Sequence, residues 1–239
     1  SDTTTNQAIT VQGKLDGTGQ IIGVCDTGMD MSSCYFSDPN VAPTYSSPDA
    51  PVTFSNHRKL VQYLTFLDNS DDVGGHGTHV AGSVAGQSLF NYGDFIKYNG
   101  MAANAKIAFF DIGDNNVEGS ISIPGNIYQG LFQLQYNAGA RIMTNSWGSS
   151  KTPTYSAQCK QVDDFMFQNQ DALVLFAAGN EGDIGTSGKS TLSSPGGAKN
   201  VLTVGATLSA NDAFKAFPNS VPDGVTDSFN QNNLAYFSS

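Results

Sequence analysis

A histidine among glycines is the first place in the sequence where residue types and spacing could support chemistry. Residues 74–82 read GGHGTHVAG, and the chain then continues with small and apolar residues. Imidazole titrates near neutral pH, so His76 could take up and release a proton during a reaction. The glycines let other backbone segments approach closely. We therefore predict that His76 is a general base at the first turn of a helix.

Two further polar side chains directly follow short apolar runs. Asp26 begins the sequence DTGMD after the run 20–25, and Asn180 lies in AAGNEG after the run 172–178. A carboxylate can hold a histidine ring in one tautomer, and an amide can donate a hydrogen bond to a developing oxyanion. Taken singly, each residue could also serve an ordinary turn.

The elements that must position these groups alternate along the chain. Buried strands are predicted at 20–25, 59–67, 105–112, 141–146, 172–178 and 200–206, where apolar runs are bounded by glycine or polar residues. Helices are predicted at 76–86, between Pro124 and Gly139, and around Val162, Phe165 and Met166. This alternation predicts an α/β fold of three layers, with a mostly parallel twisted sheet flanked by helices.

Parallel sheets bind ligands at the carboxyl ends of their strands. Asp26, the segment Ser146-Trp147-Gly148 and Asn180 each come just after a predicted strand, and His76 begins a predicted helix. We expect all four features to meet at one edge of the sheet.

Composition narrows the possible partners. The 239 residues contain no repeat or linker, so we expect one domain, and the formal net charge is −10. Nucleic acids and anionic membranes bind basic surfaces, so neither is expected as a partner. No apolar run reaches the ~18 residues that span a bilayer.

The three cysteines allow at most one internal disulfide. Cys25 lies in an apolar run and is predicted to be a buried free thiol. Cys34 and Cys159 lie in loop-like or helix-start sequence, and we predict a bridge between them, which would imply an oxidising compartment.

The motifs DTGMD, HGTHVAG, SWG and AAGNEG, in this order, resemble those of the subtilisin-like serine proteases. The segments 144–148 (TNSWG), 176–182 (FAAGNEG) and 204–207 (VGAT) make the sequence most similar to the oxidatively stable alkaline protease branch. The resemblance runs from about residue 13 to the end. It implies a subtilisin-like fold and cleavage of polypeptides.

The resemblance also implies roles for individual residues. Asp26 would orient His76, which would act as general base and then general acid, and Asn180 would be the oxyanion donor. Substrate would lie between an edge formed by residues 113–119 and a pocket wall. The pocket residues implied are Ser146, Trp147, Gly148, Ala178, Gly179 and Ser193. Ser193, at the pocket base, is small and neutral, so the substrate residue before the scissile bond need not be basic. Glu181 at the rim could tolerate a basic residue there.

The family carries its nucleophile late, in a Gly-Thr-Ser-Met-Ala motif that this sequence lacks. Ser187, in GTSG, is rejected as a substitute because it lies in a polar loop with no apolar helix after it. We therefore expect residues 1–239 to be a partial catalytic domain, with the C-terminal part missing and no hydrolysis by this chain alone. The alternative is a non-catalytic peptide-binding module that keeps the fold.

No cofactor is expected for catalysis. His76 and His79 are spaced like metal ligands but lack the acidic residue of a zinc-protease helix, so His79 is expected to pack inside the helix turn. No GxGxxG or Walker loop supports a nucleotide-binding reading. The resemblance implies a secreted or lumenal protein with structural calcium, for which Asp68, Asp71, Asp72 and Asp183 are candidates without a recognisable ligand spacing.

Overall fold

A six-stranded parallel sheet forms the centre of the computed structural model, which describes residues 15–149, 154–182, 191–208, 232–235 and 237–239. The strand order is β2-β3-β1-β4-β5-β6, and every neighbouring pair is parallel. The strands are β1 (Ile21–Asp26), β2 (Leu60–Thr65), β3 (Lys106–Asp111), β4 (Ile142–Asn145), β5 (Leu173–Ala177) and β6 (Leu202–Val204). Each lies within about a residue or two of a predicted strand.

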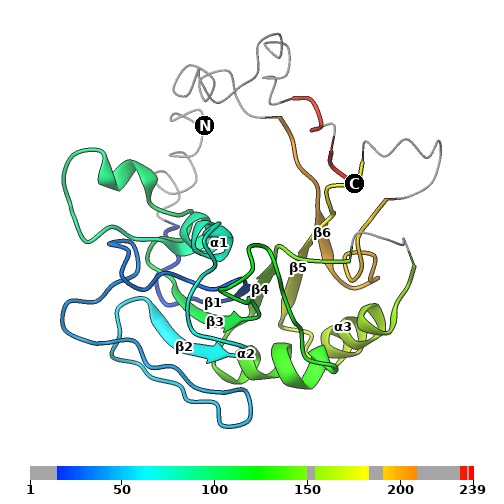
Figure 1. Cartoon of the computed structure of the whole chain (residues 1–239), viewed down its shortest axis with the longest axis horizontal. Helices are drawn as coiled ribbons and strands as arrows, with labels where there is room; N and C mark the ends of the chain where they lie inside the picture. Colours follow the sequence, from blue (N-terminus) through cyan, green and yellow to red (C-terminus); the bar gives the residue numbers. More distant parts are fainter. Residues whose placement is uncertain (1–14, 150–153, 183–190, 209–231, 236) are drawn as a thin grey trace.

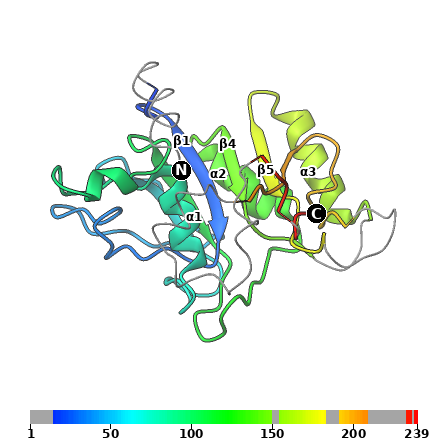
Figure 2. The same cartoon turned by 90° about the horizontal axis from the view of Figure 1, so that it is seen from above.

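Helices cover both faces of the sheet (Figures 1 and 2). Helix α1 (His76–Ala85) lies on one face, and the π-helical turn η3 (Tyr128–Phe132), α2 (Gln133–Asn137) and α3 (Ala157–Gln168) lie on the other. A short 3-10 helix, η2 (Phe95–Tyr98), was not predicted. The predicted three-layer α/β fold is confirmed.

The core is divided by the sheet into two apolar clusters. Ile22 and Val24 of β1 point to the α1 side, where Ala81 and Ala85 pack. Cys25, which follows Val24, points to the other side, which α2 and α3 cover. Both faces of β1 are therefore buried, which explains its continuous apolar sequence.

The helix predicted to open at Pro124 begins later. Helical structure starts at Ile127, and the side chain of Asn126 accepts a hydrogen bond from Gln129 N at 3.2 Å. Asn126 thus caps the helix, and Pro124, which was predicted at the first helical position, lies before it. Gln135 is fully buried, and its amide donates to Val24 O and Ala108 O at 3.0 Å each.

The predicted disulfide is wrong. Cys34 and Cys159 are free thiols, as is Cys25. Cys34 lies near α1, where its carbonyl accepts from the Arg58 guanidinium, whereas Cys159 is buried in α3 on the opposite side of the sheet. The sheet separates the two sulfurs, so no bridge can form between them.

One half of the α1-side face is open. Met143, Val174 and Phe176 point to the buried face of β4 and β5, so their neighbours in the alternation point to the α1 side. There Ile142, Leu173, Leu202 and Val204 are 44%, 38%, 49% and 49% exposed. We call these four residues the open face. Within the described residues, no helix has the length and apolar character needed to cross a bilayer.

Candidate active site

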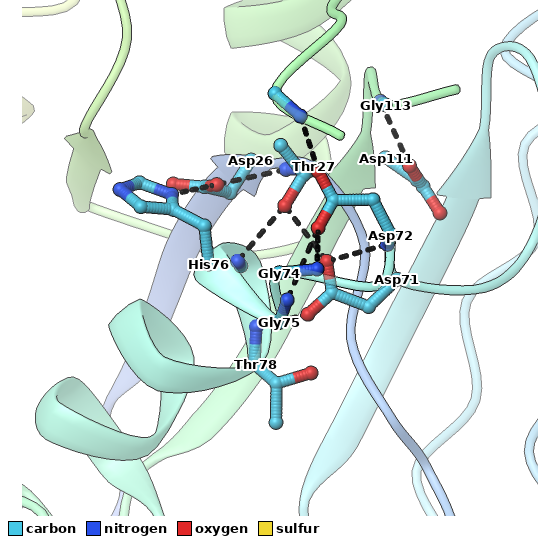
Figure 3. Close-up of polar contacts among 12 residues, drawn as sticks. Asp26, Thr27, Asp71, Asp72, Gly74, Gly75, His76, Thr78, Asp111 and Gly113 are labelled. Atoms are coloured by element: carbon cyan, nitrogen blue, oxygen red, sulfur yellow. Dashed lines mark hydrogen bonds and ion pairs between the residues drawn. The ribbon is translucent and has the colours of Figure 1, made fainter. Parts of the chain in front are cut away.

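Asp26 and His76 form a close pair at the carboxyl edge of the sheet. Asp26 ends β1 and His76 begins α1, and Asp26 Oδ1 lies 2.6 Å from His76 Nδ1 (Figure 3). The carboxylate is only 2% exposed, while the His76 side chain is 52% exposed. A proton on Nδ1 is therefore held by a buried acceptor, and the exposed ring can use its other nitrogen.

Acidic neighbours set the proton affinity of His76. The hydrogen bond that His76 donates to Asp26 raises the pKa of His76 above its ordinary value, with further contributions from the charges of Asp26, Asp71 and Asp72. Partial burial opposes this shift, because it disfavours the imidazolium. The site thus stabilises the protonated ring that a general base becomes once it has accepted a proton.

The first turn of α1 is capped by side chains from other segments. Gly75, at the N-cap position, has no side chain to accept from the helix. Instead Thr27 Oγ1 accepts from Gly77 N at 2.9 Å, and Asp71 Oδ2 accepts from Thr78 N at 2.8 Å. Thr27 in turn donates to Asp71 at 2.7 Å. These bonds join the segment after Asp26 directly to the helix that carries His76 (Figure 3).

Two glycines allow this close approach. An ideal Cβ on Gly77 would lie 2.1 Å from Gly28 O, and Gly28 itself has a φ of +131°. A side chain at Gly77 would therefore push α1 away from the segment after β1, and one at Gly28 would clash with the backbone of Ser70 and Asp71, 2.4 Å away.

Asp72 ties the loop before His76 to the edge formed by residues 113–119. Its Oδ1 accepts from Gly74 N and Gly75 N at 2.9 and 3.0 Å, and its Oδ2 accepts from Gly119 N at 2.6 Å. Both carboxylate oxygens of Asp72 thus accept hydrogen bonds from backbone N–H groups.

The side of the site opposite the segment 113–119 is built from the segment after β4. Trp147 is buried edge-on against Phe176, with ring centroids 5.2 Å apart. Ser149 N donates to Ser194 O at 2.8 Å, and an ideal Cβ on Gly148 would lie 2.7 Å from Ser193 Oγ. Gly148 therefore lets the wall pack directly against Ser193.

Asn180 lies on a turn held by a distant segment. Glu181 N donates to Ser239 Oγ at 3.0 Å, Gly182 N donates to Phe237 O at 2.9 Å, and Ser239 N donates to Gly179 O at 3.2 Å. Asn180 itself is exposed. Ala178, predicted at the substrate pocket, is instead buried behind this turn, where its N–H donates to Val204 O and its carbonyl accepts from Ser193 N.

These features surround one cleft of about 540 Å³. Asp26, His76, Ser146, Trp147, Gly148, Gly179, Asn180 and Ser193 all line it. It also contains residues that the sequence analysis missed or misplaced: Glu118 and Ile121 on the 113–119 side, and His79, which is exposed rather than packed inside the helix. Among the described residues, no hydroxyl group hydrogen-bonds to His76. Ser187 lies outside the described residues.

The calcium candidates do not form a cage. Asp68 accepts from the backbone of Ser70 and Asn115, while Asp71 and Asp72 are used as described above. No group of three or more potential metal-binding side chains occurs within the described residues, and Asp183 lies outside them. The structure assigns no site to calcium, which stays a prediction.

The fold and the site define an α/β protein with a close aspartate–histidine pair at the carboxyl edge of its parallel sheet. Comparison with known proteins identifies the family. The model of the subtilase family matches residues 17–239, so the chain belongs to this family.

Relatives and solved structures agree with this assignment. The serine protease/ABC transporter B family protein tagD of Dictyostelium discoideum is 40% identical over 205 residues, covering 84% of this chain and 11% of that protein. Subtilisin BL of Lederbergia lenta is 29% identical over 198 residues, covering 83% of this chain and 59% of that protein. The chain thus spans only part of each relative's length.

Two solved structures share the fold at low sequence identity. The subtilisin-like protease Apa1 from Pseudoalteromonas sp. AS-11 matches with a TM-score of 0.58 and 19% identity, over 98% of this chain and 42% of that one. The prenylagaramide maturation protease PagA matches with a TM-score of 0.55 and 18% identity, over 96% of this chain and 61% of that one.

Proposed function

We propose that the full-length protein is a serine endopeptidase that hydrolyses extended polypeptides. The observation that carries this proposal is the 2.6 Å pairing of buried Asp26 with His76, which opens into a cleft that also contains Asn180. A merely structural histidine would not need a buried carboxylate on one nitrogen and access to a cleft on the other side of its ring.

In this mechanism His76 accepts the proton of a serine hydroxyl as the serine oxygen attacks the peptide carbonyl. Asp26 holds the ring and stabilises the imidazolium, and the Asn180 amide donates to the oxyanion. The imidazolium then gives its proton to the leaving amine. The substrate strand lies between residues 113–119 and residues 146–148, with Ser193 beneath one of its side chains.

We propose that the nucleophilic serine belongs to a segment that follows Ser239 in the full-length protein. The support is the open face, whose four apolar side chains lie on the same side of the sheet as α1. An amphipathic helix packed there would bury them, at up to about 1.5–3 kcal/mol for each side chain that becomes fully buried. Its first turn could then present a serine to His76.

The test is labelling of the full-length protein with a fluorophosphonate, followed by peptide mapping. The expected label is on one serine outside residues 1–239, and His76→Ala should abolish it. A label on Ser187 would contradict the proposed position of the nucleophile. A protein that binds peptides but neither labels nor cleaves would instead support the non-catalytic binding module.

A pair of substitutions tests the packing of the open face. Leu202→Glu should destabilise the full-length protein, because the charge would be buried under the proposed helix. Phe167→Glu is the control, because Phe167 is 68% exposed on α3, away from this face. Equal, small effects of the two changes on the denaturation midpoint would show that nothing covers Leu202.

We also propose a secreted or lumenal location, in keeping with the family. Fractionation of the source cells tests this, and recovery of the protein with the cytosol would contradict it.

A further inference from the structure

The carboxylates along the cleft differ in what they contact. Asp26 is occupied by His76 and by Thr27 N, and Asp72 is occupied by three backbone N–H groups. The side chains of Glu118 and Glu181 have no hydrogen bond or ion pair with any described residue, although both line the cleft. Two negative charges therefore face the cleft without a partner among the described residues.

Glu118 lies close to the general base. An ideal Cβ on Gly74 would lie 3.0 Å from Glu118 Oε1, so the carboxylate is packed over the backbone two residues before His76. The next residue, Gly119, donates to Asp72 at 2.6 Å, which fixes this part of the loop to the His76 side. Because position 74 has no side chain, the carboxylate occupies space that a larger residue would fill.

Basic side chains are absent from the described lining of the cleft. Among its described lining residues there is no lysine or arginine, and the whole chain carries a net charge of −10. Charges of one sign that line a cleft favour ligand groups of the opposite sign and disfavour like charges.

We propose that Glu118 is a specificity-determining residue, which selects a lysine or arginine side chain of the substrate on the His76 side of the cleft. The proposal rests on the proposed endopeptidase function. Alternate side chains of an extended peptide point in opposite directions, so the one directed toward the Gly74–Glu118 contact meets an unpaired carboxylate. An ammonium or guanidinium group satisfies that carboxylate, whereas an aliphatic group leaves it unpaired.

Glu118 makes no hydrogen bond or ion pair with His76 within the described residues. The charges that raise the pKa of His76 most are those of Asp26, Asp71 and Asp72. Glu118→Gln keeps the size of the side chain and removes only its charge. Glu181 provides a matched comparison, because it is an unpaired acid on the opposite wall, beside Asn180.

The experiment uses the full-length protease and pairs of peptides that differ only in lysine versus norleucine. The exchange is made in turn at each of the four residues before the scissile bond, and kcat/KM is measured for each pair. We expect the wild type to prefer lysine at one position by about fivefold, as for an accessible ion pair. Glu118→Gln should abolish that preference, whereas Glu181→Gln should leave it in place. Raising the salt concentration should weaken it.

Three outcomes would overturn this inference: no lysine preference at any position in the wild type, a preference that survives in Glu118→Gln, or one that only Glu181→Gln removes. Failure of the proposed function is distinguishable, because a wild type that hydrolyses neither member of any pair would contradict the endopeptidase itself.

Discussion

The two walls of the cleft are held in place by different means. On the His76 side, the side chains of Thr27, Asp71 and Asp72 bind the backbone around the first turn of α1. On the Asn180 side, the turn is held by residues 237–239, and the neighbouring sheet face is open.

The difference shows which part of the site is held mainly by side chains. The His76 wall is built from residues 26–119 and is fastened by side-chain hydrogen bonds between segments that lie far apart in the sequence. The Asn180 wall is held mostly through backbone contacts with residues 237–239, and it also depends on whatever covers the open face. Substitutions on the His76 wall should therefore lower both the activity and the free energy of unfolding. Substitutions on the Asn180 wall should lower the activity more than the free energy of unfolding.

The largest expected effect is that of Asp26→Asn in the full-length protease. Loss of the carboxylate should lower kcat by about 10⁴-fold, because the His76 ring loses its orienting acceptor. The pKa of His76 is raised by Asp26, so its removal should move the acid limb of the kcat/KM profile to lower pH. A pH–rate series checks both effects. If the acid limb of the kcat/KM profile does not move, a group other than His76 titrates on that limb.

Asn180→Ala should lower kcat by about 10²–10³-fold, the usual cost of removing an oxyanion donor. Its effect on stability should be small, since Asn180 is exposed and its turn is held through backbone contacts. Steady-state kinetics and a urea titration separate the two quantities. A large loss of stability would show that the Asn180 wall is as dependent on side chains as the His76 wall.

Gly77→Ala should lower the free energy of unfolding by about 3 kcal/mol, at the upper end of the usual cost of overpacking, because the new methyl group would meet Gly28 O at 2.1 Å. Gly82→Ala, in the same helix, is the matched control. Its nearest neighbour would be Phe36 Cζ at 3.9 Å, so alanine should fit and stabilise the helix by up to about 1 kcal/mol. The midpoints of urea unfolding compare the two variants. Similar midpoints would contradict the close contact between Gly77 and Gly28 O.

The last effect concerns Asp111, beneath the His76 wall, and shows in the pH dependence of stability. Burial raises the pKa of this carboxyl to about 7, although Tyr63 and Gly113 N donate hydrogen bonds to it. The folded state therefore binds more protons than the unfolded state between pH 3.8 and 7, and this group makes stability rise as pH falls through that window. Asp111→Asn should remove that contribution, which urea titrations at several pH values would detect. If the free energy of unfolding of Asp111→Asn depends on pH as in the wild type, a group other than Asp111 titrates in this window.

Much of this arrangement was predictable from the sequence. The buried strands have continuous apolar sequences because both of their faces are covered, and this signal is local. The start of α1 at His76 was also predictable, because residues 74–82 combine glycines with a small, apolar helical run. Asp26, His76 and Asn180 follow or begin these elements, so their common edge followed from the parallel topology.

Other features depend on contacts that sequence does not record. The start of helical structure at Ile127 reflects capping by Asn126, and the Cys34–Cys159 prediction failed because the two residues lie on opposite sides of the sheet. The exposure of His79 depends on which face of α1 the sheet covers, and the presence of Glu118 in the cleft depends on how the loop around residues 113–119 folds back.

The sequence by itself determined which chemical groups are available: an acid, a base and an amide, each at the end or start of a regular element. Only the tertiary structure decided which groups are free to act. Asp72 and Glu118 are both acids in loops beside the cleft, but backbone N–H groups occupy the first, and the second has no partner among the described residues. The physical reason is that a loop carboxylate accepts from whichever donors folding brings near it, and these include donors from distant segments, as Gly119 N is for Asp72.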